Sequence, residues 1–204
     1  MDYLVTMTTR VPDGTSEETV ADIRTREATR ARELAAQGHL LRLWRPPLQP
    51  GEWRTLGLFA ATDRSRLEDI LVSMPLRVWR TDEVVALAPH PNDPQIEPKG
   101  GAVEFLIALN IVVPEGTPVS TVADTKTREA ERAHELAEQG YLVRLWTPPA
   151  EPGEWRVLGL WRAADAAAME AILESLPLHR WMTAEITPLA QHPNDPGITT
   201  PGWR

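Results

Sequence analysis

The amino-acid sequence contains one domain-sized pattern twice. The stretch "REATRARELAAQGHLLRLWRPPLQPGEWR" begins at Arg26, and "REAERAHELAEQGYLVRLWTPPAEPGEWR" begins at Arg128. The motif "HPNDP" recurs with the same offset, from His90 and from His192. The two copies align without a gap, and more than half of the aligned positions are identical. A solenoid needs about three or more repeats to bury a continuous core, so two copies indicate a duplicated domain.

This repeat predicts the domain organisation. We expect the first copy at 1–94, a linker "QIEPKGGA" at 95–102 and the second copy at 103–204. A duplicated domain commonly reproduces a two-fold homodimer within one chain, because the ancestral interface is self-complementary. We therefore expect each chain to resemble a dimer.

Each copy reads as strand, helix, strand, strand, helix, strand. The first strand is rich in β-branched residues, and the long helix after it begins near Thr15 or Thr117 and ends at Gly38 or Gly140. This order predicts an α+β fold, a ferredoxin-like βαββαβ domain with four antiparallel strands and both helices on one face. The other sheet face is apolar and needs a partner. We therefore expect the two sheets to pack face to face as a pseudo-dimeric α/β barrel around a shared cavity.

Composition excludes several classes of function. The net charge is −8, which disfavours binding to nucleic acid or to an anionic membrane, and there is no cysteine. The sequence has no glycine-rich phosphate loop, metal-ligand cluster or nucleophile elbow. The N-terminus "MDYLVTMTTRV" lacks a signal pattern, so we expect a cytoplasmic protein.

Two glutamates interrupt the apolar stripe of the long helix. Glu27 lies four residues after Ile23 and four before Ala31, and Glu129 holds the matching place in the second copy. Arg24 and Lys126 each precede the glutamate by three residues, within pairing distance on a helix. One interpretation is a partly buried salt bridge. The other is a catalytic carboxylate, whose pKa burial would raise toward the working pH of a general base.

Other polar residues are weaker candidates for substrate contacts. Arg42 and Arg144 lie on the second strand, where an inward-facing guanidinium would clamp a carboxylate and an outward-facing one would be solvated. His90 and His192 precede prolines, which is typical of turn or capping residues, although a role in the site is also possible.

These features together resemble the muconolactone Δ-isomerase family. The resemblance rests on the helix glutamate, on "LWR" and on "MPLRVWRTDEVVALAPHP", and it covers each copy almost completely. It implies the ferredoxin-like fold and a cofactor-free double-bond shift in a lactone during bacterial catabolism of aromatic compounds. It also implies that the pseudo-dimeric chains assemble into a homo-oligomer. Lys126 and Glu129 match the family's Lys–Glu pair, whereas Arg24 replaces the lysine before Glu27.

The resemblance also marks where this chain departs from the family. The family has Tyr-Met on the last strand, and this chain has Trp79 and Arg80 in the first copy but Trp181 and Met182 in the second. These tryptophans are candidate substrate contacts. We expect a cofactor-free isomerase of a muconolactone-like carboxylate, with Glu129 and Glu27 as catalytic residues. The alternative is a non-catalytic relative that binds a small ligand.

Overall fold

The computed structural model describes residues 1–96 and 102–198, and these form two compact units. Unit 1 consists of Met1–Leu87 together with the described residues from Ala190 onward, and unit 2 consists of Ala88–Leu189. The compact units therefore differ from the sequence repeats at their ends, because each "HPNDP" segment belongs to the unit built by the other copy. Most of the expected linker, residues 97–101, lies outside the described residues.

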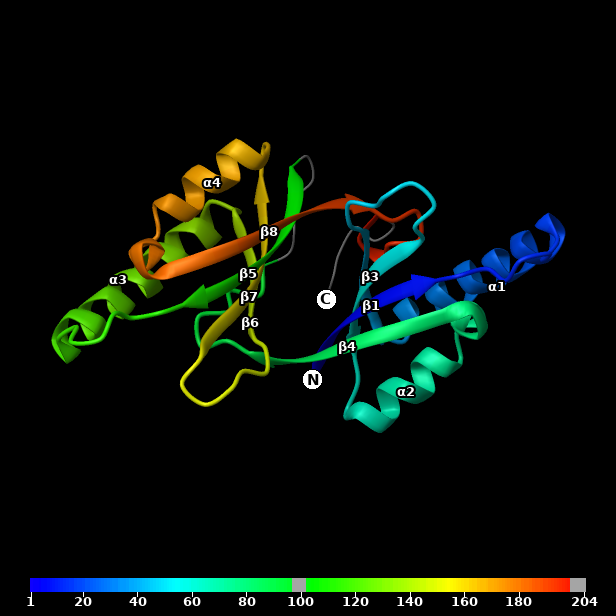
Figure 1. Ribbon diagram of the computed structural model, residues 1–204, viewed down its shortest axis with the longest axis horizontal. Helices are drawn as coiled ribbons and strands as arrows, with labels where there is room; N and C mark the ends of the chain where they lie inside the picture. Colours follow the sequence, from blue (N-terminus) through cyan, green and yellow to red (C-terminus); the bar gives the residue numbers. More distant parts are fainter. Residues whose placement is uncertain (97–101, 199–204) are drawn as a thin grey trace. The chain divides into compact units, whose positions relative to one another are not determined.

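Unit 1 has the predicted order of elements (Figure 1), which are β1 (Asp2–Thr9), α1 (Glu17–Ala36), β2 (Leu40–Arg45), β3 (Arg54–Ala60), α2 (Arg64–Val72) and β4 (Arg80–Pro89). Its strands pair in the antiparallel order β4-β1-β3-β2. A short 3₁₀ turn, Pro75–Trp79, leads into β4. The ferredoxin-like prediction is therefore confirmed for this unit.

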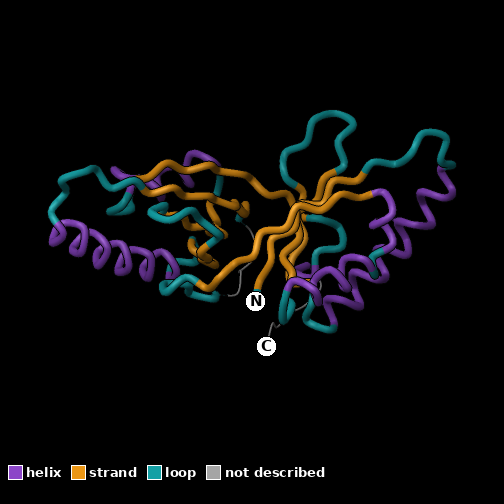
Figure 2. Tube along the Cα trace, turned by 60° about the horizontal axis from the view of Figure 1, so that its bottom comes forward, coloured by secondary structure: helices purple, strands orange, loops and turns teal. Residues whose placement is uncertain are grey.

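Unit 2 repeats the arrangement (Figure 1), with β5 (Val103–Ile111), α3 (Val119–Glu138), β6 (Leu142–Thr147), β7 (Trp155–Ala163), α4 (Ala166–Glu174) and β8 (Met182–Gln191). Its strands pair as β8-β5-β7-β6, again all antiparallel. In both units the helices run along the sheet of their own unit (Figure 2). None of the helices in the described ranges is both long and apolar enough to cross a lipid bilayer.

The two long helices begin one residue later than the sequence suggested. Ser16, and not Thr15, caps α1 by accepting a hydrogen bond from the Thr19 amide at 3.2 Å. The Thr15 hydroxyl instead donates to the carbonyl of Pro12. The predicted stop is confirmed, since Gly38 follows α1 with a φ of 73°, a conformation that glycine adopts without steric cost.

The core of each unit lies between its sheet and its helices. Alternate residues of β1 point inward, where they meet α1 and α2 around the fully buried Phe59. Trp161 occupies the matching place in unit 2. Each ring packs directly against a glycine two residues earlier in the chain. A Cβ atom on Gly57 or Gly159 would overlap the ring. These two glycines therefore allow large aromatic rings to form the sheet-side wall of the core.

Candidate functional site

A cavity of about 370 Å³ lies at matching positions in the described residues of each unit. The cavity of unit 1, called cavity 1, is lined by Glu27 of α1 and by His192, which the second copy supplies. The cavity of unit 2, called cavity 2, is lined by Glu129 of α3 and by His90, which the first copy supplies. Each cavity thus combines a glutamate from one copy with a histidine from the other, a pairing that the sequence analysis did not make.

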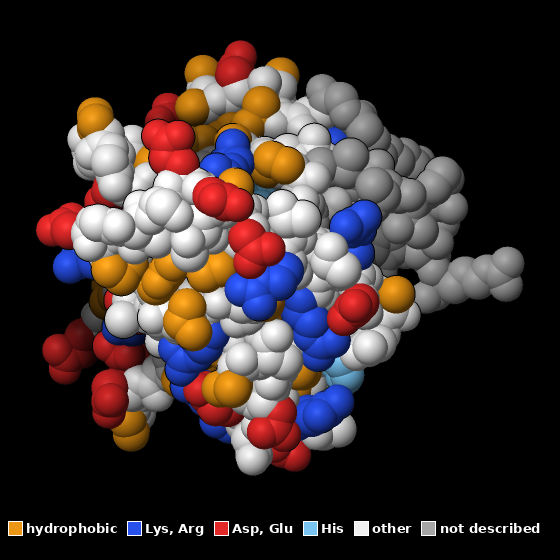
Figure 3. Space-filling view, turned by 90° about the vertical axis from the view of Figure 1, so that its right-hand side faces the viewer, with side chains coloured by type: hydrophobic (Ala, Val, Ile, Leu, Met, Phe, Trp, Pro, Cys, Tyr) orange, Lys and Arg blue, Asp and Glu red, His pale blue; other side chains and the backbone are white. Residues whose placement is uncertain are grey.

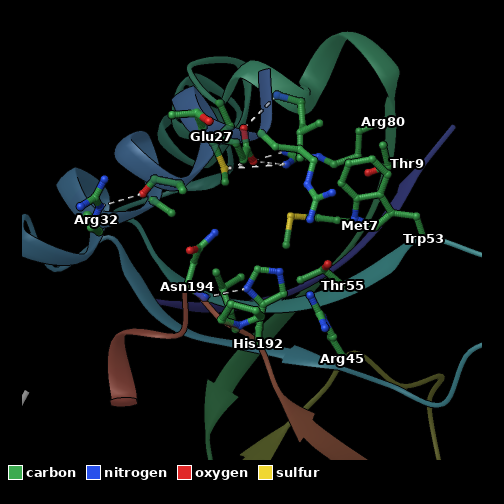
Figure 4. A pocket seen from close by; sticks show the side chains of 18 residues that line it. Met7, Thr9, Glu27, Arg32, Arg45, Trp53, Thr55, Arg80, His192 and Asn194 are labelled. Atoms are coloured by element: carbon green, nitrogen blue, oxygen red, sulfur yellow. Dashed lines mark hydrogen bonds and ion pairs between the residues drawn. The ribbon is translucent and has the colours of Figure 1, made fainter. Parts of the chain in front are cut away.

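Glu27 is buried beside cavity 1, with 8% of its surface exposed. Its Oε2 accepts a hydrogen bond from the Leu76 amide at 2.8 Å, and its Oε1 lies 3.3 Å from Nη1 of Arg80 (Figure 4). Burial raises the pKa of Glu27, and the Leu76 amide and the charge of Arg80 oppose that rise. The carboxylate is therefore held from two sides by fixed donors.

Arg80 connects Glu27 to a wider network of charges. Its Nε lies 2.6 Å from Oδ1 of Asp82, and both side chains are almost fully buried. Asp82 also lies 3.6 Å from Nη1 of Arg77. In the second copy the three matching residues are Met182, Ala184 and His179, so unit 2 has no counterpart of this network.

Glu129 is also partly buried, but it is surrounded differently. Its Oε2 accepts a hydrogen bond from the Leu178 amide at 2.9 Å, the counterpart of the Leu76 bond in unit 1. No cation forms an ion pair with Glu129 within residues 1–96 and 102–198, and Met182 lines the cavity at the position of Arg80. Burial raises the pKa of Glu129, and only the Leu178 amide is resolved as opposing it. Apolar side chains make up most of the remaining wall: Leu109, Ile111, Ala133, Leu145, Val157, Trp161 and Leu178.

The helix cations do not pair with the glutamates as expected. Nζ of Lys126 lies 4.4 Å from the ring centre of Trp155, and the guanidinium carbon of Arg24 lies 5.6 Å from that of Trp53. In the described ranges neither cation lies within ion-pair distance of its glutamate, so the predicted Lys126–Glu129 and Arg24–Glu27 pairs are wrong. Each cation is exposed and reaches the cavity wall by stacking on a tryptophan.

The two histidines have the same hydrogen-bond geometry. Nδ1 of His90 accepts from the Asn92 amide at 3.1 Å, and Nδ1 of His192 accepts from the Asn194 amide at 3.1 Å. Burial lowers the pKa of both rings, and it lowers that of His192 to about 4, helped by the nearby charge of Arg45. Each imidazole is therefore neutral near pH 7 with its proton on Nε2, because Nδ1 must be the acceptor.

Arg42 and Arg144 are not among the residues that line either cavity. Nη2 of Arg42 lies 3.1 Å from Oδ2 of Asp195, and Oδ1 of Asp195 accepts a hydrogen bond from the Leu43 amide at 2.9 Å. Nε of Arg144 forms the matching pair with Oδ2 of Asp93 at 3.1 Å. Both arginines also stack on the tryptophan two residues later in the chain. These contacts hold the "HPNDP" segment, and with it the histidine, against the second strand.

Trp79 and Trp181 also lie outside the cavity walls. Both close a 3₁₀ turn before the last strand of their unit and are partly buried. Their carbonyls accept hydrogen bonds from the amides of Arg10 and Val112. The tryptophans that line matching places in the two cavities are Trp53 and Trp155, next to the start of the third strand, and Trp161 lines cavity 2 as well. The sequence signal for them was the repeated "GEWR" after a proline-rich turn.

Sequence reasoning missed two further site features. The amides of Leu76 and Leu178 bind the glutamates, and the only hint was the repeated "PL" after the second helix. Arg80 was noted as a departure from the family but not as a partner of Glu27. Regarding metals, residues 1–96 and 102–198 hold no group of three or more His, Asp or Glu side chains suited to a metal ion.

Comparison with known proteins gives the same family on both copies. The family model described as muconolactone delta-isomerase matches residues 1–93 and 103–195. Muconolactone Delta-isomerase 1 of Acinetobacter lwoffii is 28% identical over 90 residues, covering 44% of this chain and 91% of that protein. Muconolactone Delta-isomerase of Cupriavidus pinatubonensis is 27% identical over 90 residues, covering 44% of this chain and 95% of that protein.

A solved structure resembles nearly the whole chain. The chlorite dismutase of Candidatus Nitrospira defluvii, in complex with imidazole, has a TM-score of 0.59 at 9% identity, covering 93% of this chain and 91% of that one. At this identity the likeness shows the fold alone. The fold class is therefore that expected from the sequence, a tandem of ferredoxin-like domains of the dimeric α/β barrel type.

Proposed function

Because the chain belongs to the muconolactone delta-isomerase family, we propose that cavity 2 isomerises a small unsaturated lactone that carries a carboxylate, as muconolactone does. The observation that carries this proposal is the state of Glu129. It is a partly buried carboxylate with a raised pKa, in a mostly apolar cavity, without an ion-pair partner in the described ranges. Such a group suits general acid–base catalysis near neutral pH.

In the proposed reaction Glu129 moves a single proton. Its carboxylate takes the proton from one ring carbon, so that a C–H bond breaks and its electron pair is delocalised over the conjugated double bond and the lactone carbonyl. The carboxylic acid then returns the proton to the ring carbon two positions away, and the double bond shifts. No other reactant is needed, because substrate and product are isomers. The apolar wall supports this step by excluding water, which would exchange the proton.

In this proposal His90 stabilises the intermediate of the reaction. Its Nδ1 is occupied by the Asn92 amide, so Nε2 carries the proton of the neutral ring. Negative charge develops on the lactone oxygen when the ring carbon loses its proton, and a fixed N–H donor in the cavity lowers the energy of that state. A neutral imidazole also avoids placing a full positive charge beside Glu129, which would weaken the base.

Lys126 supplies the charge that the substrate's free carboxylate requires. The cations that line cavity 2 are Lys126 and Arg156, and Arg156 already forms an ion pair with Glu154 at 3.1 Å. Nζ of Lys126 has no carboxylate partner in the described part of the chain and is held over the face of Trp155. An anionic group at the cavity rim would thus meet Lys126 while the lactone ring lies deeper, toward Glu129.

The test is a direct assay of double-bond migration. Purified protein is incubated with muconolactone and with ring-substituted analogues, and the ring protons are followed by NMR. We expect conversion by wild type and none of a lactone whose ring is saturated. Lys126→Met should raise KM about 10-fold or more with a smaller effect on kcat, whereas Lys126→Arg should retain most of the binding. Absence of conversion for every unsaturated lactone would refute the proposal.

A further inference from the structure

Cavity 1 has the same position in its unit as cavity 2, but it has a different lining. Four lining residues that are polar or charged in cavity 1 are apolar or uncharged at the matching positions of cavity 2. These pairs are Thr9 and Ile111, Arg45 and Thr147, Thr55 and Val157, and Arg80 and Met182. At all four positions the more polar residue lies in cavity 1. Two of these residues, Arg45 and Arg80, carry a positive charge.

Positive charge is therefore in excess at cavity 1. Four arginines, Arg24, Arg32, Arg45 and Arg80, line it together with the single carboxylate of Glu27. Only Arg80 has acidic partners, since none of the other three forms an ion pair in residues 1–96 and 102–198. The face of the molecule drawn in Figure 3 shows Lys and Arg side chains near its middle, with Asp and Glu among them.

The cations surround the cavity instead of clustering at one point. Arg45 lies beside His192 and Thr55, across the cavity from Glu27 and Arg80 (Figure 4). Arg32 lies on a further side, and its guanidinium donates hydrogen bonds to Ala28 and Thr29 of its own helix. A ligand inside would therefore meet positive charge from more than one direction.

We propose that cavity 1 is a binding site for a small organic dianion of the dicarboxylate type, and that it does not catalyse isomerisation. One carboxylate of the ligand would pair with Arg45, and the other would face Arg24 or Arg32. The hydroxyls of Thr9 and Thr55 add neutral donors to the wall. A volume of about 370 Å³ accommodates a short carbon chain between two charged ends, which a single phosphate would not fill.

Glu27 cannot serve as a free base in this cavity. Its two oxygens are engaged by the Leu76 amide and by Arg80, and proton abstraction would have to break the second of these interactions. The ion pair also cancels the one negative charge of the lining, which would otherwise repel an anion. The contact between Arg80 and Glu27 therefore prevents Glu27 from acting as a base, and it also leaves cavity 1 better suited to an anion. This inference does not depend on the reaction proposed for cavity 2.

Isothermal titration calorimetry on the full chain tests the proposal, with succinate as the dicarboxylate, and propionate and inorganic phosphate as comparisons. We expect succinate to bind with one site per chain and at least about 10-fold more tightly than the other two. Arg45→Thr, which installs the residue of cavity 2, should weaken succinate binding about 10-fold, equivalent to about 1.4 kcal/mol. Glu27→Gln should leave it equal or tighter.

A matched control separates this site from general surface charge. Arg64 is exposed on α2 away from the lining residues, and its counterpart in the second copy is Ala166. Arg64→Ala removes the same charge as Arg45→Thr and should leave succinate binding unchanged. The proposal is overturned if succinate does not bind, if propionate or phosphate binds equally well, or if both arginine variants lose the same affinity. None of these results depends on whether the chain isomerises a lactone.

Discussion

The guanidinium of Arg80 lies 3.3 Å from the carboxylate of Glu27, deep beside cavity 1. The matching residue of the second copy, Met182, leaves Glu129 without a cation in the described part of the chain. The difference between Arg80 and Met182 thus leaves Glu27 paired with a cation and Glu129 without one in the described residues. The fold positions both glutamates alike, and the residue on the last strand decides what each can do.

Arg80→Met should destabilise unit 1. It leaves Glu27 and Asp82 buried without their shared cation, and breaking such a pair costs about 3 kcal/mol or more. The cost should be largest at high pH. In the variant the pKa of Glu27 in the folded state lies further above its unfolded value, so stability is retained at low pH and lost as pH rises through the folded pKa. Chemical denaturation at several pH values measures this.

The control for this prediction is the double variant Arg80→Met with Glu27→Gln. A neutral glutamine still accepts the Leu76 amide, so it should recover part of the lost stability at pH 7 and little at pH 4. Equal stability of wild type and Arg80→Met at every pH would show that the ion pair contributes nothing to the fold.

Met182→Arg should give cavity 2 a buried glutamate–arginine ion pair like that of cavity 1. A guanidinium at this place would lower the pKa of Glu129 and occupy its free oxygen, so kcat/KM should fall about 100-fold or more. Met182→Leu controls for the change of shape and should retain most of the activity. Circular dichroism of both variants verifies folding. Full activity in a folded Met182→Arg protein would argue against Glu129 as the base.

The pH dependence of the reaction should report Glu129. Burial raises its pKa above the ordinary value of 4.5, and the reaction requires the ionised form, so kcat/KM should fall as pH drops through that raised pKa. The contribution of Glu129 to protein stability should instead become less favourable as pH rises through the raised pKa. The ionised carboxylate is disfavoured in the fold, so Glu129→Gln should raise the Tm at pH 7, and this gain should disappear below the unfolded pKa. A Tm lowered by the substitution at pH 7 would contradict the burial argument.

Arg144→Lys should loosen the segment that carries His90. Lysine keeps the charge but loses the Nε contact with Asp93 and the planar stacking on Trp146. We expect a loss of about 1–2 kcal/mol in the free energy of unfolding and a lower kcat. Arg42→Lys removes the matching contact with Asp195 and should cost similar stability without lowering isomerase activity. If both variants lower kcat equally, the effect of Arg144 on His90 is not specific.

Much of the fold could be predicted because its signals are local. Gly38 ends a helix through its left-handed backbone, and the strand pattern of each copy repeats without a gap. The burial of Glu27 and Glu129 followed from helical spacing, since each glutamate falls on the stripe that faces the sheet.

The partners of those glutamates could not be predicted in the same way. Arg80 lies 53 residues after Glu27 in the chain, and spacing along α1 indicated Arg24 instead. The exchange of His90 and His192 between copies depends on which compact unit each segment joins, and identical motifs in both copies leave that choice open. Asp93 and Asp195 gave no signal, because only the tertiary structure brings them to Arg144 and Arg42.

Isomerisation of the lactone in deuterated buffer tests the role of Glu129 most directly, because both the rate and any label taken up report on the proton transfer. The protein is incubated with muconolactone in deuterated buffer, and label is followed in substrate and product for wild type, Glu129→Gln and Glu27→Gln. We expect wild type to form product, Glu129→Gln to react about 10²–10⁴-fold more slowly while remaining folded, and Glu27→Gln to stay near the wild-type rate. A folded Glu129→Gln protein that converts and labels the lactone as fast as wild type would contradict the proposed mechanism.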